Sequence, residues 1–140
     1  MRGVPTLIRL ARQEVDERRS DLVRIAAARA SAAEALDTHD AEAAREAAVS
    51  MTSALELAAF SAWARQATRA RARLQQRFAE LGRSEATARE SLRDAIAQMK
   101  RLDIVLESAE AARREIATQR AGMRADERET ARHTAMAEAA

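Results

Sequence analysis

Five arginines in the middle of the chain are the residues best suited to chemistry. No acidic residue lies between Glu56 and Glu80, in a chain whose formal net charge is only +2. Four of these arginines follow one another at intervals of four residues and would form one ridge of a helix: Arg65, Arg69, Arg73 and Arg77. Phe60 and the only tryptophan, Trp63, stand just upstream. An aromatic anchor beside guanidinium groups has the composition of a binding hot spot, so this stretch predicts a partner surface.

Two other interpretations of the arginines stay open. Acidic residues of the preceding segment would lie near the start of the ridge in a hairpin and would neutralise it: Glu34, Asp37, Asp40 and Glu42. Guanidinium groups also suit a nucleic-acid backbone, but the sequence has no second basic face to support that use. We therefore expect a protein partner or a solvated ridge, and no nucleic acid.

Other groups capable of catalysis or metal binding are few. His39 and His133 are the only histidines and there is no cysteine, which is too few ligands for a usual structural zinc site. Carboxylates act as acid and base in concave, partly dry pockets that shift their pKa values, and a two-helix rod offers none. No glycine-rich phosphate loop is present. The sequence predicts a protein that is not an enzyme, with no cofactor, metal or small-molecule substrate.

The composition indicates that helices alone position these residues. Aromatic residues make up 2% of the chain, with three glycines and one proline, so strands and tight turns have little to be built from. Alanine, leucine, arginine and glutamate, which are strong helix formers, dominate instead. We expect an all-α fold.

A seven-residue repeat runs from Phe60 to Ala137. Its positions are apolar except Thr130: Phe60, Ala67, Leu74, Leu81, Ala88, Ala95, Leu102, Ala109, Ile116, Met123, Thr130 and Ala137. A second row one turn further on widens it with Phe78, Leu92, Met99 and Leu106. Such a repeat is typical of a helix that keeps one seam against a partner, as in a coiled coil.

A weaker repeat precedes it and predicts a first helix. Ile8, Val15, Leu22 and Leu36 recur in sevens, and Arg29 interrupts them. We expect one domain over residues 1–140, an antiparallel two-helix coiled-coil hairpin with a longer second helix. Its first helix would cover about 5–48, the turn about 48–53 and the second helix about 53–135. Ser53 and Glu56 form a capping-box pattern at the start of the second helix, and residues 37–40 are a possible earlier break.

The two helices differ in length, and this asymmetry is informative about function. A turn near residue 50 would set residue i opposite about 101 minus i, so the first helix would cover the second only to about residue 96. Apolar residues of the second helix would then lie beyond that end: Leu102, Val105, Leu106, Ile116 and Met123. A long unpaired apolar seam predicts either self-association or another protein that receives this end.

The N-terminal residues carry no apolar run of signal-peptide length, and no segment approaches the roughly 20 apolar residues of a membrane span. With no cysteine, disulfides are excluded. These features predict a cytoplasmic protein.

Four segments together resemble a known family. LIRLARQEVDERRSDL, AAFSAWARQATRAR, MKRL and RADERETAR follow in this order, and the last contains Asp126 and Glu127. They resemble the FliJ family, the small coiled-coil component of the bacterial flagellar type III protein export apparatus. The resemblance spans nearly the whole chain, and the chain departs from the family in its alanine richness and its lack of tyrosine.

The resemblance implies a stalk similar to that of rotary ATPases. The helix ends, including the five seam residues beyond the first helix, would enter the pore of the hexameric flagellar export ATPase and promote its assembly. The chain would contact the cytoplasmic domain of the export gate protein and escort export chaperones. It would therefore lie at the cytoplasmic face of the inner membrane at the flagellar base. Carried over by position, the gate contacts would be Phe60, Ala64, Ala67 and Arg71.

Two alternatives remain beside the flagellar stalk. One is the equivalent stalk of a virulence type III secretion system. The other is a self-assembling structural coiled coil whose unpaired seams pair with each other, which predicts a concentration-dependent dimer or tetramer.

Overall fold

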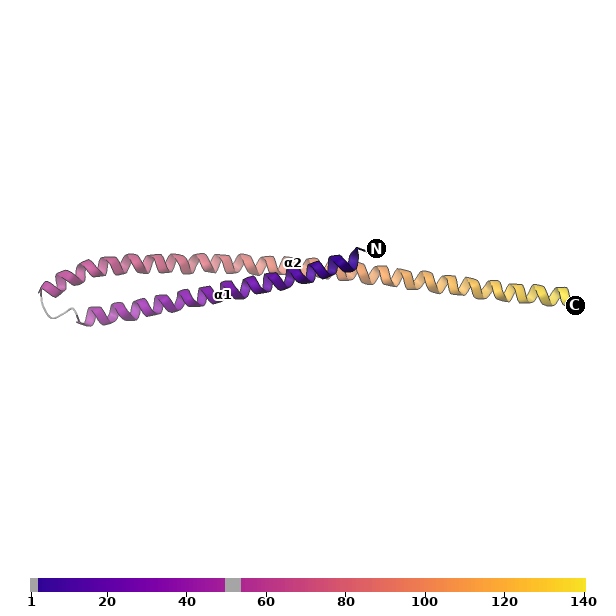
Figure 1. Ribbon diagram of the computed structural model, residues 1–140, viewed down its shortest axis with the longest axis horizontal. Coiled ribbons are helices and arrows are strands. Elements are labelled where there is room, and N and C mark those ends of the chain that lie inside the picture. Colours follow the sequence, from indigo (N-terminus) through magenta and orange to yellow (C-terminus); the bar gives the residue numbers. More distant parts are fainter. Residues whose placement is uncertain (1–2, 50–53) are drawn as a thin grey trace. The chain divides into compact units, whose positions relative to one another are not determined.

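The chain forms two long helices. The computed structural model describes residues 3–49 and 54–140, in which α1 spans Val4–Val49 and α2 spans Ala54–Ala139 (Figure 1). No strand occurs among these described residues. The helices pack against each other in antiparallel fashion, and α2 is the longer by forty residues. The predicted fold class, an all-α two-helix hairpin with a longer second helix, is confirmed.

Local sequence explains where the helices begin and where they continue. Pro5 lies in the first turn of α1, where its missing N–H costs no hydrogen bond, and the Leu7 amide donates to the Gly3 carbonyl at 2.9 Å. The break considered at residues 37–40 is wrong, because α1 runs through them without interruption. At the C-terminal end α2 continues four residues beyond the expected boundary, to Ala139. The predicted turn and Ser53 of the capping box lie outside the described residues.

The described residues divide into two compact units. The hairpin unit comprises residues 13–96 and therefore most of α1 with the first half of α2. The terminal unit comprises residues 3–12 and 97–140, the start of α1 with the second half of α2. The prediction of a single domain stays a prediction.

The core of the hairpin unit is thin and built mainly from small residues. Val15, Ala32 and Ala95 are the buried apolar side chains, whereas Ile25 and Phe78 are among those that are half-buried. Two helices cover only one face of each other, so most seam residues keep one edge in water. The alanines let the two helices approach closely at the expense of buried apolar area. This unit therefore needs more than apolar burial to fix how its helices align.

The register of the hairpin differs from the expected one. Arg29 was expected opposite Ala72, but its guanidinium pairs with Glu85 at 3.1 Å, one to two heptads further along α2. The start of α2 is exposed over residues 54–59, and Phe60 is its first half-buried residue. The observed register brings charged seam residues of opposite sign together, as in the Arg29–Glu85 pair.

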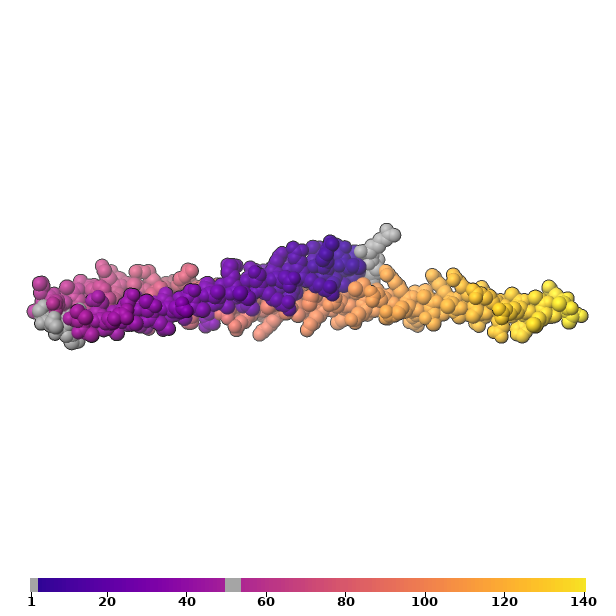
Figure 2. Space-filling model, turned by 60° about the horizontal axis from the view of Figure 1, so that its bottom comes forward, coloured from indigo at the N-terminus to yellow at the C-terminus, as the bar shows by residue number. Residues whose placement is uncertain are grey.

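The terminal unit consists of a short two-helix part and a long single helix. Ile8 is buried there, and one turn later Arg12 pairs with Asp103 at 3.8 Å. Beyond Ala109 every described residue is exposed, over the end of α2 that is yellow in Figures 1 and 2. We call residues 110–139 the solitary segment.

Candidate functional site

The arginine ridge, defined as Arg65, Arg69, Arg73 and Arg77, is open to solvent in the hairpin unit. All four side chains are exposed, and none of them forms an ion pair with any residue that the structure describes. Their spacing of four residues in α2 sets consecutive guanidinium groups about 6 Å apart along the helix axis. The ridge is therefore a row of four positive charges available to a partner.

The acids of α1 do not neutralise the ridge as the alternative interpretation expected. Of the four candidates only Asp40 forms an ion pair with an arginine of α2, and its partner is Arg71, which is not a ridge residue. Arg71 donates from Nε to one Asp40 oxygen at 2.7 Å and from Nη2 to the other at 3.2 Å, a bidentate pair. The hydrogen bond from Arg71 holds the pKa of Asp40 below its ordinary value. Glu34, Asp37 and Glu42 make no ion pair within 4 Å among the described residues.

A shallow groove of about 480 Å³ runs beside the ridge, between α1 and α2 of the hairpin unit. Arg69 and Arg73 line one side of it with Trp63, and His39 and Glu42 of α1 line the other. His39 is half-buried, and its Nδ1 atom has no hydrogen-bond partner among the described residues. The groove thus joins the aromatic anchor to the middle of the arginine ridge.

The aromatic anchor itself is compact. The rings of Phe60 and Trp63 stack with their centroids 5.6 Å apart and an angle of 28° between planes. Both side chains are half-buried, and both line a second shallow groove next to Val49 at the end of α1. Their aromatic faces are therefore only partly available, and their packing fixes where Trp63 stands relative to the ridge.

The four residues carried over as gate contacts lie on the edge of α2 nearer to α1. Phe60, Ala64 and Ala67 are half-buried, and Ala67 lines the groove opposite His39. Arg71 is exposed but is already engaged by Asp40. This row and the arginine ridge are thus neighbouring rows of the same helical stretch, and Ala67 shares a groove with Arg69 and Arg73.

A charged cluster in the seam was missed by sequence reasoning. Glu85 is only 6% exposed, and it accepts hydrogen bonds from Arg29 at 3.1 Å and from Arg89 at 2.6 Å. The Arg29 guanidinium also lies over the Phe78 ring, 5.0 Å from its centroid, in a cation–π contact. Gly82 stands one turn from both Phe78 and Glu85, and a Cβ there would be in van der Waals contact with Arg29.

The sequence did hold a signal for this cluster. Arg29 interrupts the heptads of α1, and Glu85 stands seven residues after Phe78 and seven before Leu92, so it interrupts the second row of α2. Two interruptions of opposite sign, one per helix, indicate a seam ion pair that selects one register. Matching Arg29 to Glu85 places the two helices in the register that the structure shows.

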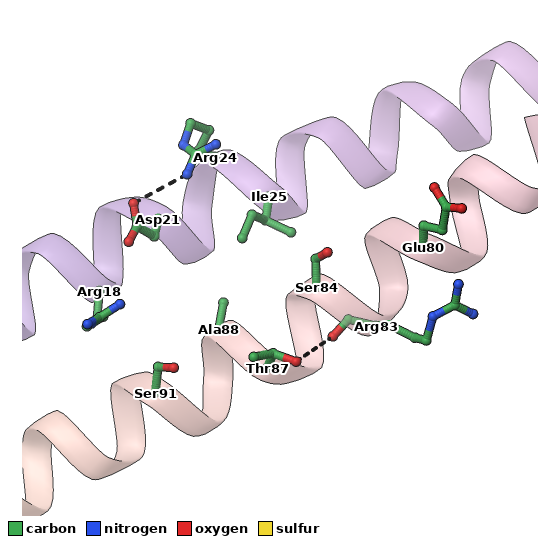
Figure 3. A pocket seen from close by; sticks show the side chains of 10 residues that line it. All are labelled: Arg18, Asp21, Arg24, Ile25, Glu80, Arg83, Ser84, Thr87, Ala88 and Ser91. Atoms are coloured by element: carbon green, nitrogen blue, oxygen red, sulfur yellow. Dashed lines mark hydrogen bonds and ion pairs between the residues drawn. The ribbon is translucent and has the colours of Figure 1, made fainter.

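Another groove of the hairpin unit, also of about 480 Å³, lies on a different face. Ile25 of α1 and Ala88 of α2 point into it, with charged side chains along its rim (Figure 3). The rim arginines of α1 are engaged within their own helix: Arg18 pairs with Glu14 at 2.8 Å, and Arg24 pairs with Asp21 at 3.4 Å. No group there is arranged for catalysis, so we interpret it as a solvated face.

The five seam residues expected beyond the first helix separate into two groups in the terminal unit. Leu102 and Leu106 are half-buried, because α1 reaches Asp103, and the expectation that the first helix ends near residue 96 of the second is wrong. Val105 is 45% exposed. Ile116 and Met123 lie in the solitary segment and are 48% and 62% exposed. The unpaired seam is therefore shorter than expected and centred on these two residues.

Neither a metal-binding cluster nor a membrane-spanning helix is found among the described residues. Among residues 3–49 and 54–140, no three His, Cys, Asp or Glu side chains come together in a way that would hold a metal ion. Within the same ranges neither helix has a stretch long and apolar enough to cross a membrane.

Comparisons with protein-family models, with curated proteins and with solved structures find no match to this chain.

Proposed function

We propose that this chain is the non-enzymatic coiled-coil stalk of a flagellar type III protein export apparatus, which enters the hexameric export ATPase and promotes its assembly and activity. The observation that carries the proposal is the solitary segment, about thirty residues of helix whose apolar Ile116 and Met123 are exposed among the residues that the structure describes. The four sequence segments that resemble the FliJ family in order and spacing support the same function.

The two parts of the chain would divide the work. The solitary segment would enter the central pore of the ATPase ring and cover Ile116 and Met123 there. Because a single helix in a sixfold ring contacts the subunits unequally, it would bias their conformations without any chemistry of its own. The hairpin unit would stay outside the pore, contact the export gate protein near Phe60, Ala64, Ala67 and Arg71, and receive export chaperones. The protein would thus work at the cytoplasmic face of the inner membrane.

The proposal is tested by adding the protein to the flagellar export ATPase of the same organism and measuring ATP hydrolysis against protein concentration. We expect a rise that saturates near one chain per about six ATPase subunits, as a ring with one central stalk requires. A chain that ends at Glu110 keeps the whole hairpin but lacks the apolar residues of the solitary segment, and it should not stimulate.

Point variants separate the solitary segment from general surface hydrophobicity. Ile116→Ser with Met123→Ser should abolish stimulation. The matched control, Val23→Ser with Leu55→Ser, removes two apolar side chains that are 69% and 83% exposed in the hairpin unit and should leave stimulation unchanged. A flat response from an ATPase shown to form hexamers would overturn the proposal.

The self-assembling coiled coil is favoured by the same exposed seam and makes an opposite prediction. Sedimentation at increasing concentration would then show a dimer or tetramer that reverts to monomer in the Ile116→Ser, Met123→Ser variant. A monomer at all concentrations would exclude it.

A further inference from the structure

We propose that the arginine ridge is a docking surface for an acidic protein helix, one that carries carboxylates at intervals of three to four residues along one face. This surface lies in the hairpin unit, on residues separate from the solitary segment, and the inference does not depend on the proposed function. The first support is the charge pattern: the 23 residues from Leu57 to Ala79 hold five arginines and no acid.

The second support is that the ridge arginines form no ion pair with a described residue, although acidic residues of α1 lie near them in the fold. Glu42 lines the same groove as Arg69 and Arg73 but forms no ion pair with either among the described residues. Asp40 is within reach of α2, but it pairs with Arg71 through both of its oxygens and not with a ridge arginine. The fold thus brings opposite charges near each other, and among the described residues the four ridge arginines have no carboxylate partner.

The third support is geometric. The ridge arginines recur every four residues in a straight stretch of helix, and carboxylates at the same interval on a second helix would have the same spacing of about 6 Å. The groove beside Trp63 gives such a helix an apolar contact, since Trp63, Ala67 and Ala70 line it together with Arg69 and Arg73. Arginine rows beside an aromatic side chain are the composition from which protein interfaces draw most of their binding energy.

The charge distribution favours a protein helix over the other anionic surfaces. A nucleic acid needs a broad basic face, whereas this ridge is one residue wide and has Glu42 beside its groove. An anionic membrane is flat and would meet Glu42 beside the groove together with the ridge. A narrow helix can engage a single row of arginines and avoid this acid.

The test uses the full chain and a synthetic helical peptide of about 20 residues with glutamate at every fourth position. Binding is followed by the anisotropy of a labelled peptide and by the fluorescence of Trp63, the only tryptophan. We expect binding that weakens as salt rises, and none for the peptide with glutamine in place of each glutamate. Because Trp63 stands in the groove beside the ridge, its emission should change as the peptide binds.

Paired variants locate the site. Arg69→Ala with Arg73→Ala should weaken peptide binding by about tenfold, since each exposed charge contact contributes a factor of a few. Arg93→Ala with Arg101→Ala removes the same charge from exposed positions of α2 outside the ridge and should weaken it by less than about twofold. Circular dichroism checks that both variants remain helical.

Three outcomes would overturn the proposal. These are no binding of the glutamate peptide at low salt, equal loss in the two double variants, or tighter ridge-dependent binding of a single-stranded oligonucleotide or of phosphatidylglycerol vesicles. The last result would assign the ridge to nucleic acid or to lipid.

Discussion

The seam of the hairpin unit and the seam of the solitary segment share one heptad repeat but differ in what covers them. In the hairpin unit α1 lies against the repeat, and even its charged interruptions are answered: Arg29 reaches Glu85, and Arg71 reaches Asp40. In the solitary segment Ile116 and Met123 continue the repeat, but their side chains are 48% and 62% exposed. A seam whose charged positions are paired within the chain thus stabilises the fold, whereas a seam with exposed apolar residues indicates that another molecule binds there.

The largest contrast is expected between an isoleucine that is buried in the two-helix part of the terminal unit and one in the solitary segment. Ile8→Ala should lower the free energy of unfolding by about 2–3 kcal/mol, because the side chain is 4% exposed and its loss leaves a cavity. Ile116→Ala should change it by less than about 0.5 kcal/mol, because that side chain is 48% exposed. Urea unfolding followed by circular dichroism measures both. Equal losses would show that the solitary segment is packed in solution.

A smaller contrast is expected for glutamate. Glu85→Ala removes a buried carboxylate with two arginine partners, and we expect a loss of about 1–2 kcal/mol. This loss is smaller than for a fully buried ion pair, because the Arg29 and Arg89 side chains are 42% and 60% exposed and can be solvated once Glu85 is removed. Glu127→Ala is the matched control in the solitary segment and should be neutral within about 0.5 kcal/mol. A neutral Glu85→Ala in the same urea unfolding measurement would show that the cluster contributes nothing to stability.

The smallest effect concerns pH and the Asp40–Arg71 pair. The pKa of Asp40 is lowered in the folded chain, so its ionised form contributes stability above the pKa of the unfolded chain, and that contribution is lost as the pH falls through the folded pKa. Asp40→Asn should therefore lower the melting temperature slightly at pH 7, and the difference from the parent chain should vanish in acid. A difference that persists in acid would mean that the substitution acts through packing.

The dependence of each variant's stability on salt concentration serves as a control for the Asp40–Arg71 prediction. Both side chains of the pair are more than 40% exposed, so 1 M NaCl should reduce the effect of Asp40→Asn at pH 7. The effect of Ile8→Ala should not fall with salt, because it depends on apolar burial.

The sequence by itself determined the secondary structure and the general topology. Alanine, leucine, arginine and glutamate favour helices, a seven-residue apolar repeat requires a partner along one seam, and a chain with two such repeats of unequal length folds into a hairpin with an unpaired end. The predicted helices and the apolar exposure at Ile116 and Met123 follow from these local preferences. The arginine ridge was also visible, because a spacing of four always places residues along one side of a helix.

The sequence signals the register only through the charged interruptions Arg29 and Glu85, and which other charges meet was decided by the tertiary structure. Heptad patterns repeat every seven residues, so apolar residues alone allow several alignments, and the expected alignment placed Arg29 opposite Ala72. In the observed alignment Arg29 pairs with Glu85, and Arg71 pairs with Asp40. Among the described residues, the ridge arginines form no ion pair in this alignment. This selection among carboxylates depends on distances between two helices, which no spacing within one helix specifies.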